Sequence, residues 1–228
     1  LWSPRRKSLA SASDSYRTPP APSPAGGRPR DLAARVSGPP RRPPAPRRLK
    51  IAFVTPELSP LAQRTQLAEW CHALTQALRA SNADVRVFLP RSGSVQEEQL
   101  TDAQRVATVR VADGGAVTEV TIDSATVDGL PVYVFDHPQL FGARNAYGDE
   151  EGPYPDNWRR YAVFSRAVLA SLEDLDFAPE IIHCVDWTTG LIPVLRRLEY
   201  SRKKPDHPAS QAGTFFQVLN LAMQGAFE

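Results

Sequence analysis

Two loops that follow apolar segments are the places where this sequence is expected to do chemistry. Residues 55–65 form a proline-broken loop directly after the apolar run 51–54. Residues 136–157 form a second loop, 22 residues long and without hydrophobic periodicity. Ligands of open parallel sheets bind at the carboxyl ends of strands, and unusually long loops are often functional. Both loops are therefore candidate ligand-binding segments.

The cysteines and histidines do not have the spacing of a metal site. Cys71 falls on an expected helix and Cys184 on an expected strand, so both are predicted to be buried, reduced thiols. Reduced thiols of this kind favour a reducing compartment. We expect His72 and His207 at the surface and His183 on a strand, with no paired ligands, and hence no metal.

The first candidate loop lies inside a βαβ unit. Residues 51–54 are an apolar strand, and residues 85–89 are a second one. Between them Leu67, Cys71 and Leu78 recur with a helical period. This order predicts the opening of a parallel sheet.

The rest of the body continues this α/β pattern. After a polar stretch, residues 91–104, the order predicts short strands, a hairpin with a turn at residues 113–115, two helices and two more strands. Asp156 or Asn157 is expected to cap the first of these helices. The fold class is therefore α/β: a Rossmann-like parallel sheet with flanking helices and an inserted β-hairpin. The predicted strands are 106–111, 116–122, 131–135, 181–185 and 214–219; the helix stripes are Tyr161, Phe164, Val168 and Leu172, then Leu191, Val194, Leu195 and Leu198.

Charge and proline content separate an arm, residues 1–48, from the body, residues 49–228. The arm and its boundary hold 11 Lys or Arg residues, two Asp residues and 11 of the 22 prolines, a net charge of +9. Because the whole chain is +2, the body carries −7, which makes nucleic acid an unlikely partner. No apolar run reaches the roughly 18 residues of a membrane span.

The arm is predicted to be disordered, since its composition cannot bury enough apolar surface to offset chain ordering. Three interpretations remain open: a plain linker, a transit peptide, or a basic binding arm. The chain begins with Leu and stops nine residues after its last expected strand, so we expect a partial sequence.

Four stretches, in order, resemble the bacterial glycogen synthase and plant starch synthase family. The most specific is FDHPQLFGARNAYGDEEGPYPDNWRRYAVFSRAVL, residues 135–169, which is similar to the family's DHP-x-LF, YG, YPDN and RF-x-FS-x-A-x-L series. IIHCVDWTTGLIP, residues 181–193, resembles VHAHDWHTGLVP. FFQVLNLAMQGAF, residues 215–227, resembles FTIHNLAYQGLF, and residues 49–78 resemble the family's opening segment without a gap.

The resemblance implies the amino-terminal lobe of a two-lobed GT-B glycosyltransferase. Family members transfer glucose from ADP-glucose to the non-reducing end of an α-1,4-glucan and retain the anomeric configuration. The implied partners are an α-1,4-glucan or maltooligosaccharide and a carboxy-terminal lobe that is missing here. ADP-glucose is the donor, and no separate cofactor is implied. The expected location is cytoplasmic, or plastid if the arm is a transit peptide.

This chain departs from the family where the family binds the donor. Gln63 stands in place of the lysine of the Lys-Thr-Gly-Gly-Leu-Gly-Asp loop, and Thr65 and Gln66 replace its two glycines. Glu69 replaces its Asp, and Leu219 replaces the His before Asn220. A lysine would supply charge at the leaving phosphate, and the glycines would let the backbone approach it.

The residues that match the family are implied to hold the glucan acceptor. Asp186 would accept from sugar hydroxyls or cap the next helix, and Trp187 would stack on a sugar face or pack internally. The remaining candidates would line the same groove or form a turn and a helix start: Asn220, Gln224 and Gly225, and Tyr154, Asp156 and Asn157.

Two hypotheses follow. The chain is a glucosyltransferase lobe impaired by its replaced lysine and histidine, or it is a non-catalytic glucan-binding or regulatory module with the same fold. Both require that Gln63, Asp186 and Leu219 surround one shared hollow.

Overall fold

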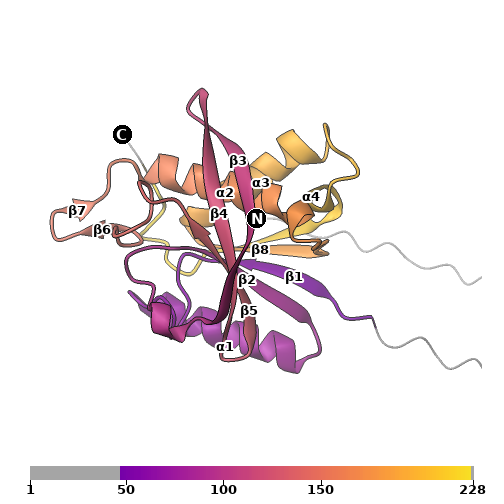
Figure 1. Cartoon of the computed structure of the whole chain (residues 1–228), viewed down its shortest axis with the longest axis horizontal. Coiled ribbons are helices and arrows are strands. Elements are labelled where there is room, and N and C mark those ends of the chain that lie inside the picture. Colours follow the sequence, from indigo (N-terminus) through magenta and orange to yellow (C-terminus); the bar gives the residue numbers. More distant parts are fainter. Residues whose placement is uncertain (1–46, 227–228) are drawn as a thin grey trace, which may run out of the picture. The chain divides into compact units, whose positions relative to one another are not determined.

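A seven-stranded sheet forms the centre of the computed structural model, which describes residues 47–226 (Figure 1). Five neighbouring strands run parallel, and the hairpin strands β3 and β4 extend the sheet in antiparallel fashion. The order is β3 (Thr101–Asp113), β4 (Ala116–Val127), β5 (Leu130–Asp136), β2 (Asp84–Pro90), β1 (Lys50–Val54), β8 (Ile181–Val185) and β9 (Gly213–Gln217).

Helices cover both faces of this sheet (Figure 1). Helix α1 packs on one face, and α2, α3 and α4 pack on the other. The helical elements are α1 (Gln66–Ala80), η1 (Glu97–Gln99), α2 (Asn157–Asp174), η2 (Trp187–Thr189), α3 (Leu191–Leu195), the π-helical turn η3 (Arg196–Tyr200) and α4 (Pro208–Gln211). A separate ribbon of β6 (Gly148–Asp149) and β7 (Gly152–Pro153) lies in the long loop before α2.

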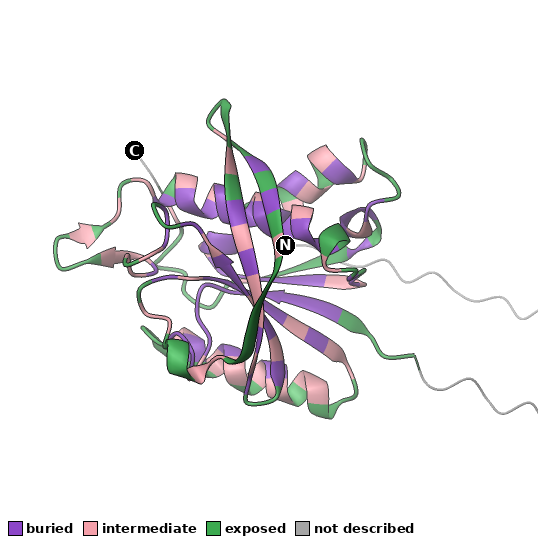
Figure 2. Ribbon diagram, in the orientation of Figure 1, coloured by how far each residue is buried: buried purple, intermediate pink, exposed green. Residues whose placement is uncertain are grey.

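The alternation of side chains along β1 explains why both faces need a cover. Ile51 and Phe53 join the apolar cluster under α1, whereas Ala52 and Val54 join the cluster under α2. All four are buried, as Figure 2 shows for the central strands. A strand that is apolar on both faces is typical of the middle of a parallel sheet.

The predicted fold class is confirmed by this architecture, including the βαβ unit and the inserted hairpin. Gly114 and Gly115 form the hairpin turn with φ of 58° and 93°, values that glycine adopts readily. One boundary was wrong: β3 begins at Thr101, inside the stretch expected to be polar loop. Its first residues are exposed, which is why their side chains gave no strand pattern.

The prediction that the apolar stripe of residues 191–198 forms a buried helix face is wrong. Leu191, Val194 and Leu198 are 42%, 50% and 48% exposed, and Leu195 alone of that stripe is buried. α3 instead turns Ile192 toward the core. The α-helix also ends at Leu195, where a π-helical turn takes over.

His207 was expected at the surface but is 7% exposed and caps α4. Its Nδ1 accepts the backbone N–H of Ala209 at 3.1 Å. Cys71 and Cys184 are free and buried, as predicted, and burial raises the pKa of each thiol to about 12.

The arm, residues 1–48, lies outside the described residues except for its last two. Within residues 47–226, no helix has the length and apolar character needed to cross a membrane.

Candidate functional site

The carboxylate of Glu57 holds together the loop between β1 and α1. The residue is fully buried, and Oε2 accepts hydrogen bonds from the backbone N–H groups of Arg64 (2.6 Å) and Thr65 (2.8 Å). Oε1 accepts from the hydroxyls of Thr65 (3.0 Å) and Tyr147 (2.6 Å). A buried carboxylate is costly unless donors surround it, and these four donors fix the loop.

Thr65 begins α1, and its hydroxyl accepts the N–H of Leu67 at 3.2 Å. Gln63, at the position of the family lysine, is engaged with its neighbours. Its Nε2 donates to Glu69 Oε1 at 2.9 Å, and its Oε1 accepts from the Ser59 hydroxyl at 3.2 Å. The two substituted polar residues therefore bind each other.

Arg160 organises the long loop that precedes α2. It is fully buried and donates to the carbonyls of Leu140 (2.6 Å), Asn145 (2.8 Å) and Ala146 (2.9 Å). It also donates to Asn157 Oδ1 at 2.7 Å. Five guanidinium N–H groups in a planar fork can satisfy several carbonyls at once, which orders an otherwise irregular segment.

Asp156 binds Arg144 and does not cap α2 as predicted. Although it occupies the N-cap position, its carboxylate makes a bidentate pair with Arg144 at 2.5 and 2.7 Å. That pairing lowers the pKa of Asp156 below its ordinary value. The guanidinium of Arg144 also lies 4.2 Å from the ring centre of Tyr154. Tyr154 and Asp156 thus form one cluster with Arg144.

Asp186, at the end of β8, binds the segment that follows β9. It is 5% exposed, and its Oδ1 accepts from the backbone N–H of Leu219 (2.6 Å) and of Asn220 (3.4 Å). Its backbone N–H donates to the carbonyl of Gln217 at 2.8 Å. Asp186 occupies the N-cap position of η2 but its side chain makes no capping hydrogen bond there, so the capping alternative is not supported.

Trp187 packs among aromatic rings and against a glycine. Its ring centre is 5.1 Å from that of Tyr161, edge to face, and 6.3 Å from that of Tyr147. A Cβ on Gly225 would lie 2.6 Å from Cε3 of the indole, so the absence of a side chain at Gly225 permits this contact. Gly225 has a φ of 64°.

The segment after β9 folds back on itself through its own amides. Asn220 Oδ1 accepts the N–H of Ala222 at 3.0 Å, and Gln224 Nε2 donates to the carbonyl of Leu221 at 2.7 Å. These bonds occupy one group of each side chain. Both residues also line the adjoining pocket.

These elements enclose a pocket of about 880 Å³, within the range of small-ligand sites. Three aromatic rings and four side-chain amides line it, and Asp186 is the sole charged residue among the sixteen described lining residues. They are Thr65, Gln66, Leu67, Trp70, Tyr147, Pro153, Asn157, Asp186, Trp187, Leu219, Asn220, Ala222, Met223, Gln224, Gly225 and Ala226.

The structure brings most of the predicted residues together. Seven lie on the pocket: Asn157, Asp186, Trp187, Leu219, Asn220, Gln224 and Gly225. Four do not line it: Gln63, Glu69, Tyr154 and Asp156. Of the three residues that both hypotheses place around one hollow, Asp186 and Leu219 line it and Gln63 does not. The loop of Gln63 reaches it two residues later, at Thr65.

Sequence reasoning missed Glu57, Tyr147 and Trp70. Glu57 had one signal, an acidic residue inside the apolar segment TPELSPL, where burial would demand partners. Tyr147 is buried, and burial together with the Glu57 carboxylate raises its pKa well above the ordinary value. Its hydroxyl therefore stays protonated and donates.

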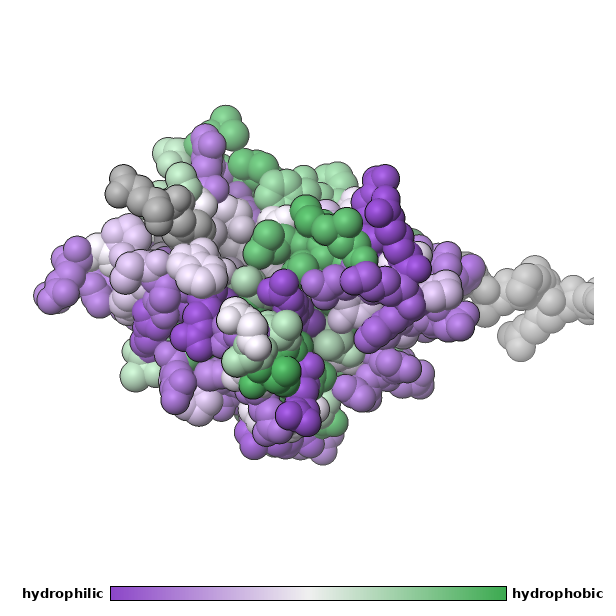
Figure 3. Space-filling model, turned by 90° about the horizontal axis from the view of Figure 1, so that it is seen from above, coloured by the Kyte–Doolittle hydropathy of each residue, from purple (hydrophilic) through white to green (hydrophobic). Residues whose placement is uncertain are grey.

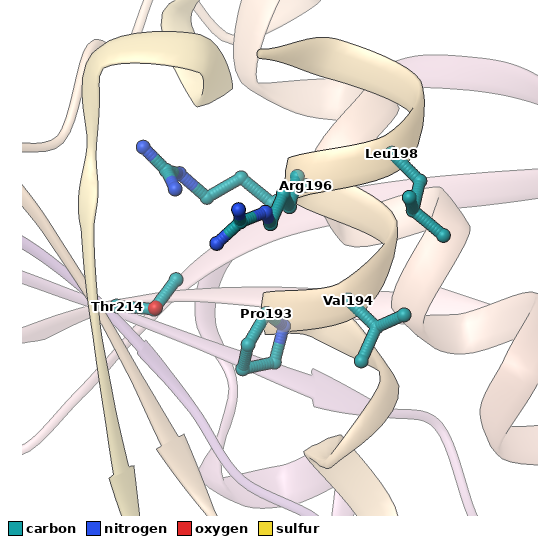
Figure 4. Close-up of a pocket in the computed structure, with 6 residues that line it drawn as sticks. Pro193, Val194, Arg196, Leu198 and Thr214 are labelled. Carbon is teal, nitrogen blue, oxygen red and sulfur yellow. The ribbon is translucent and has the colours of Figure 1, made fainter. Parts of the chain in front are cut away.

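A second hollow of about 370 Å³ lies between η3 and β9 (Figure 4). Pro193 and Arg196 lie on the side of the helix toward Thr214, while Val194 and Leu198 lie on its other side (Figure 4). Arg196 is held by the carbonyls of Ala209 and Ser210, at 3.0 and 2.9 Å.

Exposed apolar side chains are frequent in the last part of the described chain, and two of them, Val194 and Leu198, line the second hollow. Figure 3 shows apolar side chains collected in the middle of the face seen from above. Nine large apolar residues between positions 191 and 223 are at least 38% exposed. They are Leu191, Val194, Leu198, Phe215, Phe216, Val218, Leu219, Leu221 and Met223. An apolar surface of this extent is typical of a contact with further polypeptide.

Comparison with known proteins gives consistent matches over the described body. Residues 50–228 match the model of the starch synthase catalytic domain. The chain is 36% identical over 179 residues to a glycogen synthase of Geotalea daltonii, and 37% identical over 180 residues to glycogen synthase 2 of Geobacter sulfurreducens. Each match covers 78% of this chain and 36% of the relative.

A solved structure also matches. It is the catalytic domain of starch synthase IV from Arabidopsis thaliana, bound to ADP and acarbose, with a TM-score of 0.68 and 28% identity. The match covers 76% of this chain and 34% of that one. The chain thus spans about a third of the length of the relatives it matches.

Proposed function

Because this chain belongs to the starch synthase catalytic domain family, we propose that it is the acceptor-holding lobe of an α-1,4-glucan glucosyltransferase. The proposed reaction of the whole protein transfers glucose from ADP-glucose to the 4-hydroxyl at the non-reducing end of the glucan. The lobe described here supplies the wall that holds the glucan. ADP-glucose is the donor in this proposal, with no further cofactor.

The chemistry of the pocket lining carries the proposal. Aromatic rings of Trp70, Tyr147 and Trp187 offer apolar surface, and four amides with Asp186 offer both donors and acceptors. Uncharged sugars present an apolar ring face and many hydroxyls, so this lining matches them. The Arabidopsis neighbour was solved with ADP and acarbose bound, which supports a ligand site in this fold.

The same lining supports weak use of the donor. A departing nucleoside diphosphate carries negative charge, and fixed cations at that position are a large catalytic term. No Lys, Arg or His lies among the described residues that line the pocket. Gln63 is uncharged and engaged with Glu69, and Leu219 offers no imidazole. We therefore propose that transfer is impaired.

A second lobe is part of the proposal. β9 is the outer strand of the described sheet next to β8, and its Phe215 and Phe216 are 54% and 44% exposed. Further polypeptide packed on this edge would remove apolar surface from water. The greater length of the relatives supports a partner of this kind.

The alternative function is a non-catalytic glucan-binding or regulatory module. The pocket without cations favours it, since glucan binding needs no leaving-group charge. Location in the cytoplasm remains our proposal. The plastid alternative depends on the arm, of which residues 1–46 lie outside the described part of the chain.

Titration with maltoheptaose tests glucan binding. Trp187 and Trp70 line the pocket, so we expect saturable quenching or enhancement of tryptophan fluorescence. Trp158 is 53% exposed and does not line the pocket, which makes Trp158→Phe the matched control for Trp187→Phe. The control should keep the signal and the affinity. A titration that leaves fluorescence and amide shifts unmoved would rule out the proposed acceptor site.

Donor use is tested by labelled ADP-glucose. We expect no incorporation into glucan by this chain, and weak donor binding. The double variant Gln63→Lys with Leu219→His should bind ADP-glucose more tightly than the unsubstituted chain. Equal affinity of the two proteins for ADP-glucose would contradict the explanation that the missing lysine and histidine cause the impairment.

A further inference from the structure

Glu57 joins two walls of the pocket without lining it. One wall is the start of α1, where Thr65, Gln66 and Leu67 face the cavity. The other is the long loop, which contributes Tyr147. The carboxylate of Glu57 accepts from both walls, through Arg64 and Thr65 on one side and Tyr147 on the other.

The four donors to Glu57 are all uncharged. Two are backbone N–H groups and two are hydroxyls, and no Lys or Arg makes an ion pair with this carboxylate within the described residues. A buried carboxylate has no water at hand to replace a lost hydrogen-bond donor. Removal of one of the four donors therefore destabilises the Glu57 carboxylate in its place, and with it the segments that hold the other three donors.

The hydroxyl of Thr65 links this carboxylate to the helix itself. It donates to Glu57 Oε1 and accepts from the N–H of Leu67, so its proton points to the carboxylate and its lone pair to α1. Glu57 thereby sets both the entry of the chain into α1 and the orientation of the cap. Leu67 and Gln66 take their places on the pocket wall from that start.

Tyr147 is held at its other end by the long loop. Its carbonyl accepts from Asn157 Nδ2 at 2.7 Å and from the N–H of Tyr154 at 3.1 Å. Its ring approaches Trp187, with 6.3 Å between ring centres. The hydrogen bond from its hydroxyl to Glu57 thus ties this loop to the α1 start.

We propose that Glu57 is a positioning residue of the pocket: through Tyr147 it sets the separation between the α1 start and the long loop, and so couples ligand binding to the backbone at Arg64 and Thr65. The identity of the ligand rests on the proposed glucan-binding function. The coupling between the two walls does not, because it follows from contacts within the chain.

The first test is Tyr147→Phe, which removes one hydroxyl and leaves the ring. Tyr133→Phe is the matched control, since its hydroxyl accepts from Arg86 at 3.0 Å and does not line the pocket. Hydrogen–deuterium exchange at the amides of Arg64 and Thr65 should become faster in Tyr147→Phe and stay unchanged in Tyr133→Phe. Unchanged exchange in both variants would overturn the coupling.

Maltoheptaose affinity is the second readout, and it separates positioning from general stability. Tyr147→Phe should weaken affinity about three- to tenfold, the range of one typical net hydrogen bond. Tyr133→Phe should leave affinity unchanged even where it lowers the melting temperature. Equal affinity in Tyr147→Phe and the unsubstituted protein would overturn the positioning role.

Glu57→Gln gives an independent arm, because its amide cannot accept on both sides. In the double variant Glu57→Gln with Tyr147→Phe, the increase in the amide exchange rate at Thr65 should differ from the sum of the increases in the two single variants. An increase equal to that sum would contradict a shared acceptor. If the unsubstituted protein binds no maltoheptaose, the proposed function fails while the exchange experiment still decides the coupling.

Discussion

Asp186 accepts a 2.6 Å hydrogen bond through Oδ1 from the backbone N–H of Leu219, and this bond joins the end of β8 to the segment that follows β9. Asp186 has φ 54° and ψ −176°, a backbone region that is essentially restricted to glycine and costs roughly 1–3 kcal/mol for other residues. Strain retained at a carboxylate indicates that its position is needed. Leu219 lines the pocket, so Asp186 places part of the pocket wall.

Substitution of Asp186 should separate these roles. Asp186→Ala removes the acceptor for Leu219 and should lower the free energy of unfolding by about 2 kcal/mol. Asp186→Asn keeps an acceptor oxygen in a side chain of the same size, so its loss should be about 1 kcal/mol. Urea unfolding measures both. Equal stabilities of the alanine variant and the unsubstituted protein would contradict the structural role of this bond.

Gly225 should not tolerate a side chain, because a Cβ there would lie 2.6 Å from the indole of Trp187. Gly114→Ala is the matched control: its φ of 58° is close to the 64° of Gly225, and nothing lies within 4 Å of its Cβ position. Gly225→Ala should therefore cost about 1 kcal/mol more than the control, from overpacking, and should also reduce maltoheptaose binding. Similar losses in both variants would mean that backbone strain alone is at work.

Strand ends could be predicted from the sequence, and that is why part of the pocket was foreseen. Asp186 and Asn220 each follow an apolar strand, and β8 and β9 are neighbours in the sheet, so their carboxyl ends meet. The hairpin turn at Gly114 could also be predicted, because a turn of this type depends on the residues of the turn itself.

Contacts between distant segments could not be predicted in this way. The bond between Glu57 and Tyr147 joins residues 90 positions apart, and no local pattern specifies such a pair. Asp156 looked like a helix cap, but Arg144 competes for its carboxylate. The stripe through Val194 had the right period for a buried helix face, yet period does not reveal which face packs.

Arg160 is expected to be irreplaceable by lysine. Arg160→Lys keeps a positive charge but loses the planar fork that binds the carbonyls of Leu140, Asn145 and Ala146. At least two buried carbonyls would lose their donor, so the free energy of unfolding should fall by about 2–4 kcal/mol. The neighbouring Arg159→Lys is the control.

The side chain of Arg159 is 42% exposed and pairs with Asp113, and lysine keeps the positive charge of that pair, so Arg159→Lys should cost less stability than Arg160→Lys. Chemical denaturation of both variants tests the contrast. The idea that Arg160 orders the long loop would be refuted if the two variants lost the same stability, or if amide exchange in residues 140–147 stayed unchanged in Arg160→Lys.

The pH dependence of stability should depend on His207. Burial lowers the pKa of this imidazole below the ordinary value of about 6.5, and the neutral Nδ1 accepts the N–H of Ala209. Between the folded pKa and about 6.5 the unfolded state binds more protons, so stability should fall as pH falls through that window and level off below the folded pKa. His183, also shifted down by burial, adds in the same direction.

His207→Asn isolates this contribution, since asparagine is a good N-cap acceptor that does not titrate. Glu173, 3.8 Å from Nε2, favours the charged imidazole, while Lys204 opposes it, and both remain in the variant. Urea unfolding at several pH values between 7.5 and 5 should give a flatter dependence for His207→Asn than for the unsubstituted protein, with the remaining slope from His183. Parallel curves for the two proteins would show that the cap at α4 does not require a neutral imidazole.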